Sequence, residues 1–127
     1  MLNLSHKQLD VYKIALLMVN EIYTITKAFP KEEQFVLVTQ LRRAAVSVCS
    51  NLAEGAARKS IKEKKRFYEI SRSSLVEIDT QIEISLILNY TKTEYITNLK
   101  KYVESIFRML SKMITNLESK TPLATSN

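Results

Sequence analysis

Residues 40–60 read QLRRAAVSVCSNLAEGAARKS, a stretch without proline that is rich in alanine, valine and serine. This composition predicts a helix. Gly55 is a suitable residue to end the helix because glycine enters the left-handed conformation without steric cost. When the helix is drawn on a wheel, one of its faces carries the residues expected in the core of a bundle: Leu37, Leu41, Ala45, Val48 and Leu52.

The same helix has a second apolar face, formed by Phe35, Val46, Cys49 and Ala53, with Arg42 in its middle. A helix on the surface of a domain needs only one apolar face. We therefore expect this helix either to be wedged between neighbouring helices or to contact another subunit. Its small side chains allow close approach of another backbone in both cases.

The whole chain of 127 residues contains one glycine and two prolines, so it has few residues that interrupt helices. Apolar periodicity predicts helices over residues 5–28, 30–55 and 60–88, and a fourth that begins at Thr91 or Thr93 and carries an apolar stripe to Leu117. The fold class is therefore all-α. We predict an antiparallel up-down-up-down four-helix bundle over residues 1–120 and a disordered tail over residues 121–127. The alternative is an extended helical hairpin that completes its core by oligomerising.

The start of each middle helix has its own signal. Pro30 suits the first turn of a helix, where its missing N–H is not needed. Ser60 and Glu63 have the spacing of a capping box, in which each side chain satisfies a free N–H of the other residue.

The predicted helix over residues 60–88 turns several polar side chains inward, and its small serines could meet the alanines of the helix before it. Glu77 lies at the edge of this inward arc, and a carboxylate there needs a partner because an unpaired buried charge is costly. We predict that Glu54 or Glu77 pairs with Arg42 or Arg43, within a subunit or across an interface. The alternative is that these groups reach water at the rim of the bundle. The predicted polar cluster comprises Arg42, Arg43, Asn51, Glu54, Ser74 and Glu77.

The formal net charge of +6 is concentrated in residues 58–66, RKSIKEKKR, which hold six basic residues and one acidic residue. Such a concentration predicts binding to the phosphates of nucleic acid. Only Phe67 and Tyr68 follow it, and Phe67 is expected in the core, so readout of bases is not implied. The alternatives are a solvated basic end and a scaffold that docks an acidic protein. The candidate nucleic-acid-binding residues are Arg58, Lys59, Lys62, Lys64, Lys65 and Arg66.

Residue types that carry enzymatic chemistry are scarce. His6 is the only histidine, whereas a di-metal site in a bundle needs two Glu-x-x-His pairs. One glycine cannot form a glycine-rich phosphate loop. Cys49 lies in the middle of a helix without a nearby base and is expected to be a packing residue. We therefore expect no catalytic residue, no metal site and no cofactor.

No apolar run approaches the about 18 residues of a membrane span, and from the N-terminal residues we expect no secretory signal. We expect a cytoplasmic protein without contact to a membrane.

The segments LRRAAVSVCSNLAEGAARKS and RFYEISRSSLVEIDTQI together resemble the signature of proteins encoded by intervening sequences in large-subunit ribosomal RNA genes. LDVYKIA and FRMLSKMITNL extend the resemblance to nearly the whole chain. The family includes relatives that serve as accessory variability proteins of diversity-generating retroelements. The resemblance differs at Cys49, where many relatives have proline, and at Tyr12, where tryptophan is common.

The resemblance implies a four-helix bundle that assembles into a homopentamer, a role in binding nucleic acid, and no enzymatic activity. It also implies a protein partner such as a reverse transcriptase. In a pentamer, the second apolar face of the helix over residues 30–55 would pack against a neighbouring protomer, with Arg42 as an interface arginine.

Overall fold

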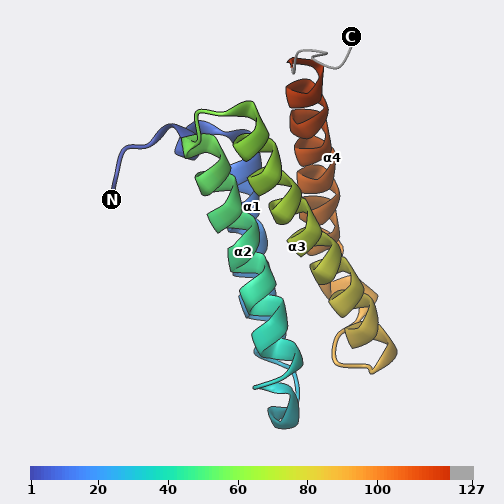
Figure 1. Cartoon of the computed structure of the whole chain (residues 1–127). Helices are drawn as coiled ribbons and strands as arrows, with labels where there is room; N and C mark the ends of the chain where they lie inside the picture. Colours follow the sequence, from blue (N-terminus) through green and yellow to red (C-terminus); the bar gives the residue numbers. More distant parts are fainter. Residues whose placement is uncertain (121–127) are drawn as a thin grey trace.

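The computed structural model describes residues 1–120, which form four α-helices and no β-strand (Figure 1). The prediction of an all-α chain is confirmed for these residues. The tail predicted over residues 121–127 lies outside them. The α-helices are α1 (Asp10–Thr26), α2 (Leu37–Ala57), α3 (Ile61–Ile87) and α4 (Thr97–Lys120), and three short 3-10 helices are η1 (Ser5–Gln8), η2 (Lys31–Glu33) and η3 (Thr93–Tyr95).

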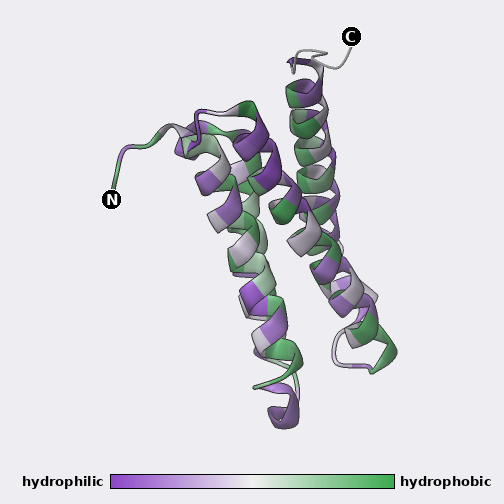
Figure 2. Cartoon of the chain, in the orientation of Figure 1, coloured by the Kyte–Doolittle hydropathy of each residue, from purple (hydrophilic) through white to green (hydrophobic). Residues whose placement is uncertain are grey.

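Each α-helix packs against the helix before it and the helix after it, and α4 packs against α1. Figure 1 shows the α1–α2 and α3–α4 connections at one end of the molecule and the α2–α3 connection at the other. Hydrophobic and hydrophilic residues alternate around each helix in Figure 2, and the periodic apolar residues lie in one core. No helix in residues 1–120 is long and apolar enough to cross a membrane.

Helix α2 is wedged between its neighbours in the chain. Its core face is buried as predicted: Leu37, Leu41, Ala45, Val48 and Leu52 are all inaccessible or nearly so. Cys49 on the second apolar face is buried too, because α1 and η1 pack against α2 on one side while α3 packs against it on the other. Phe35 and Val46 of that face remain exposed.

Gly55 does not end α2, contrary to the prediction, because the helix continues to Ala57 and Gly55 lacks a left-handed φ angle. Its role is close packing. A Cβ atom at this position would lie 2.6 Å from Cε1 of Tyr68 and 3.3 Å from Cβ of Phe67. The absence of a side chain therefore lets α3 approach α2 just before the two helices are connected.

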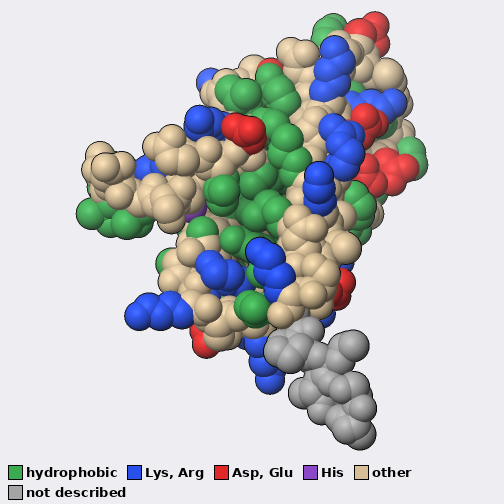
Figure 3. All heavy atoms as spheres, turned by 90° about the horizontal axis from the view of Figure 1, so that it is seen from above, with side chains coloured by type: hydrophobic (Ala, Val, Ile, Leu, Met, Phe, Trp, Pro, Cys, Tyr) green, Lys and Arg blue, Asp and Glu red, His purple; other side chains and the backbone are tan. Residues whose placement is uncertain are grey.

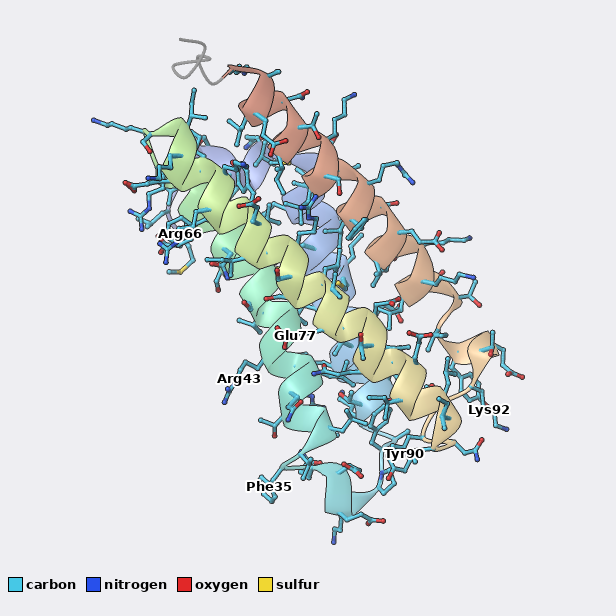
Figure 4. The ribbon with its side chains drawn as sticks, turned by 45° about the vertical axis from the view of Figure 1, so that its right-hand side comes forward. Phe35, Arg43, Arg66, Glu77, Tyr90 and Lys92 are labelled. Atoms are coloured by element: carbon cyan, nitrogen blue, oxygen red, sulfur yellow. The ribbon has the colours of Figure 1, made fainter. Side chains whose placement is uncertain are left out.

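The predicted start of the second helix at Pro30 is also wrong. Residues 31–33 form η2, and α2 begins only at Leu37. Phe29 is buried beside the ring of Tyr90, and the Tyr90 hydroxyl donates a hydrogen bond to Glu33 Oε2 at 2.8 Å. These contacts hold the chain against the α3–α4 connection and favour a turn where local sequence suggests continuous helix (Figure 4).

Serines of α3 lie at the α2–α3 contact, and their predicted meeting with the alanines of α2 stays a prediction. Ser71 is buried and donates from its hydroxyl to the Val48 carbonyl at 2.8 Å. Ser85, also buried, donates to the carbonyl of Gln81 one turn earlier at 2.8 Å. Small hydroxyl side chains thus satisfy their own hydrogen bonds while two backbones lie close together.

Candidate nucleic-acid interface

The basic cluster, defined as Arg58, Lys59, Lys62, Lys64, Lys65 and Arg66, lies on the α2–α3 connection and the first turns of α3. Ser60 begins α3 by accepting a hydrogen bond from the Glu63 backbone N–H at 3.0 Å, as the capping spacing predicts. The Glu63 carboxylate is turned toward Arg58, so the half of the capping box that forms is the hydrogen bond accepted by Ser60. The remaining free N–H groups give this helix end a partial positive charge that adds to the six cations.

Three members of the cluster are engaged within the chain. Lys64 Nζ donates to the carbonyls of Gly55 and Ala56 at 3.3 and 3.1 Å and thereby caps the end of α2. Lys65 Nζ lies 2.9 Å from Glu118 Oε2 on α4, and this hydrogen-bonded carboxylate raises the pKa of Lys65.

Arg58 is the third engaged cation. Its Nη2 lies 2.9 Å from Glu54 Oε2, and its Nε lies 3.7 Å from Glu63 Oε1. Two carboxylates thus compete with any external phosphate for this guanidinium group, and they lower the positive charge that Arg58 offers to a ligand.

The other three cations, Lys59, Lys62 and Arg66, are exposed and have no ion pair within residues 1–120. In the view from above, several Lys and Arg side chains gather in the lower part of the molecule (Figure 3). This free part of the basic cluster is the part available to phosphates.

Phe67 is only partly buried, whereas the sequence suggested a core residue. The guanidinium carbons of Arg58 and Arg66 lie 4.7 and 5.5 Å from the centre of its ring. Cation–π contacts of this kind orient the guanidinium groups without neutralising them. Phe67 therefore acts as a support for two arginines.

The six residues of the predicted polar cluster do not form one cluster. Arg42 reaches α1, where its Nε donates to Thr26 Oγ1 at 2.9 Å and its guanidinium lies 4.5 Å from the centre of the Tyr23 ring. It forms no ion pair with Glu54 or Glu77 in the described chain. A hydroxyl, a carbonyl and an aromatic face thus replace the carboxylate that was predicted as its partner.

The ion-pair prediction also fails for the two carboxylates within one chain. Glu54 pairs with Arg58 one turn later, and Glu77 is exposed without an ion pair among residues 1–120. Arg43 is exposed as well, and Figure 4 shows Arg43 and Glu77 on the outside of α2 and α3. Both charges reach water, so burial does not require them to be paired.

Asn51 and Ser74, the last two members of the predicted polar cluster, are brought together by a residue that was not singled out. Asn51 Nδ2 donates to the Ser47 carbonyl at 2.9 Å and to Ser47 Oγ at 3.0 Å. Ser47 Oγ in turn lies 2.9 Å from Ser74 Oγ. The spacing of Ser47 and Asn51, which lie one helical turn apart on α2, is the signal that could have revealed this link.

Burial raises the pKa of the Cys49 thiol to about 11. At about pH 8 the thiolate fraction should be on the order of a hundredfold below that of an unperturbed cysteine, whose pKa is about 8.5. We expect dithionitrobenzoate to react with the native protein at least about a hundredfold more slowly than with the guanidinium-unfolded chain. Equal rates would show that the thiol is accessible and ionised.

Comparison with known proteins gives one clear result. The family model described as 23S rRNA-intervening sequence protein matches residues 7–112, which include all four α-helices in whole or in part and the entire basic cluster. A search of curated proteins gives no significant match.

Proposed function

Since this chain belongs to the family of 23S rRNA-intervening sequence proteins, we propose that it is a non-enzymatic accessory protein that binds nucleic acid through the phosphate backbone. The observation that carries this proposal is the basic cluster. Three of its cations are exposed and have no ion pair within residues 1–120, and they lie at the N-terminal end of the 27-residue helix α3.

The proposed mechanism of binding is electrostatic. Lys59, Lys62 and Arg66 replace counterions on the phosphates, and release of those counterions supplies the affinity. The ring of Phe67 is covered by two guanidinium groups, so it offers little surface on which a base could stack. RNA and DNA should both bind, with little preference for sequence.

The scaffold that we propose is an antiparallel up-down-up-down four-helix bundle, assembled as a homopentamer in the cytoplasm. Contacts of each helix with its two neighbours and connections at alternating ends support the bundle. Exposed apolar side chains on its helices support self-association. A ring of five copies would repeat the basic cluster five times, which strengthens binding to a polyanion through avidity.

A protein scaffold is the second candidate function, because carboxylates of this chain already pair with Arg58 and Lys65. An acidic surface on a partner protein, such as a reverse transcriptase, could pair with the free cations in the same way.

Fluorescence anisotropy with labelled RNA, labelled DNA and polyglutamate, each at the same salt concentrations, separates the two functions. We expect both nucleic acids to bind and polyglutamate to bind much more weakly. Tight binding of polyglutamate without binding of nucleic acid would contradict the proposal and favour the protein scaffold.

Glu118→Gln should strengthen RNA binding because it releases Lys65 from its ion pair. One additional phosphate contact on a single strand corresponds to roughly fivefold in affinity at about 0.1 M salt. Glu94→Gln is the control, because it changes the net charge equally at the opposite end of the molecule, within the α3–α4 connection. Equal effects of both variants on the dissociation constant would show that only net charge matters.

A further inference from the structure

One flank of the molecule, the α1–α2 face, carries exposed apolar side chains around Arg42. Arg42 crosses from α2 to lie on the ring of Tyr23, which places Tyr23 on this face. Leu16, seven residues before Tyr23, lies two turns along the same side of α1, and Val46 lies one turn after Arg42 on α2. Leu16 and Val46 are 47% and 45% exposed.

The flank formed by α3 and α4 contains cavities. Two adjoining cavities of about 340 and 410 Å³ lie between α3 and α4, and they share Asp79, Val103 and Glu104 in their walls. Val76 and Phe107 line the second cavity and are 51% and 43% exposed. We call the two cavities together the α3–α4 groove. Its lining is mostly apolar, which is unusual for a surface that faces only water.

The charges on the two flanks are complementary. The α3–α4 groove is lined by three carboxylates, Asp79, Glu83 and Glu104, none of which forms an ion pair within residues 1–120. It is also lined by Lys100 and Arg108, so acidic residues outnumber basic ones in it by one. The α1–α2 face carries Arg42, and Arg43 lies beside it on α2. Both arginines also lack a carboxylate partner in the described chain. Opposite charges around apolar centres are typical of surfaces that pack together.

We propose that the α3–α4 groove receives the α1–α2 face of a second copy of this chain. The four helices pack in a ring, in which the α2–α3 contact is the most extensive and the α1–α2, α3–α4 and α4–α1 contacts are of similar extent, so the α1–α2 pair lies opposite the α3–α4 pair. The two flanks therefore face away from each other, and one copy can be engaged on both at once. Because the two surfaces differ, the contact is heterologous and closes into a ring when the rotation between copies permits. This inference rests on the self-association in the proposed function and assigns the surfaces that form it.

The test uses Leu16→Glu on the α1–α2 face and Val76→Glu in the α3–α4 groove. Both side chains are about half exposed, so each charge is tolerated in the folded protomer. Leu17→Glu is the control, because Leu17 is 50% exposed but lies on the side of α1 that also carries Glu21 and Thr24, near the α3–α4 connection. Val46→Glu is a second variant on the α1–α2 face if Leu16→Glu fails to fold.

Sedimentation at micromolar concentration should give a multimer for the unmodified protein and for Leu17→Glu, and a single protomer for Leu16→Glu and Val76→Glu. A mixture of the last two should form dimers, because each variant retains the surface that the other has lost. The proposal is overturned by a monomeric unmodified protein, by unchanged multimers of both face variants, by dissociation of Leu17→Glu, or by a mixture that stays monomeric.

Binding of RNA by the unmodified protein is measured separately and distinguishes the two proposals. Suppose that the unmodified protein is a multimer that binds RNA, and that both face variants keep the mass of this multimer. This result would refute the assigned surfaces and leave the proposed function intact. Dissociation in the expected pattern without RNA binding would refute the function and leave the surfaces intact.

Discussion

Gly55→Ala should destabilise the protein by about 2 kcal/mol, although the same change stabilises an ordinary helix by about 1 kcal/mol. The added methyl group would lie 2.6 Å from Cε1 of Tyr68, a distance that forces either the buried ring or α3 to move. Overpacking of this kind costs about 1–3 kcal/mol. Urea denaturation at one fixed protein concentration measures the change, because the stability of an assembly depends on its concentration.

The control is the same substitution in a Tyr68→Ala background. Without the ring, the methyl group at position 55 has space, and Gly55→Ala should then stabilise by about 1 kcal/mol through helix propensity alone. The sign of the effect therefore reverses between the two backgrounds. A stabilising Gly55→Ala in the protein that retains Tyr68 would show that α2 and α3 leave room for a methyl group at position 55 and do not pack closely there.

Replacing Lys59, Lys62 and Arg66 together with glutamine should weaken RNA binding about a hundredfold at about 0.1 M salt. Each phosphate contact on a single strand contributes roughly fivefold under these conditions, and three contacts multiply. The helix should persist because glutamine is nearly as good a helix former as lysine. Loss of affinity should be similar for every sequence, since the contacts are to phosphates.

The matched control replaces Lys13, Lys92 and Lys101 with glutamine. These lysines are also exposed and their loss lowers the net charge equally, but they lie outside the basic cluster. We expect the control to bind RNA within about threefold of the unmodified protein because distant charges are screened by salt. Equal losses in both triple variants would mean that binding depends on net charge and has no defined site.

Core positions could be predicted from the sequence because the buried face of a helix carries apolar residues at regular three- and four-residue spacing. Leu37, Leu41, Ala45, Val48 and Leu52 are all in the core, and the inward serines of α3 do meet α2. The cap at Ser60 was predictable for a related reason, since it depends on residues three positions apart. These features depend on residues that are close in the sequence, so the local sequence is enough to predict them.

Features that depend on distant partners could not be predicted. Glycine is a common residue at the end of a helix, but the role of Gly55 depends on the ring of Tyr68 in the next helix. Arg42 was expected to find a carboxylate, yet its neighbours in the fold are Thr26 and Tyr23 of α1. Charge alone suggests pairs of opposite sign, whereas an arginine is equally satisfied by oxygen acceptors and an aromatic face.

At the candidate site, too, some features could be predicted from the sequence and others could not. Charge counting identified all six cations of the basic cluster, but it could not tell which of them are free. Lys65 is paired with Glu118, a residue 53 positions later on α4, and Lys64 binds carbonyls at the end of α2. Only the packed structure distinguishes these from Lys59, Lys62 and Arg66.

The most direct test of phosphate binding at the basic cluster is the slope of the logarithm of the RNA binding constant against the logarithm of salt concentration. Each phosphate contact on a single strand contributes about −0.7 to this slope. The slope should be steep for the unmodified protein and shallower by about 2 when Lys59, Lys62 and Arg66 are replaced with glutamine. An identical slope for the two proteins would contradict the assignment of the basic cluster as a nucleic-acid interface.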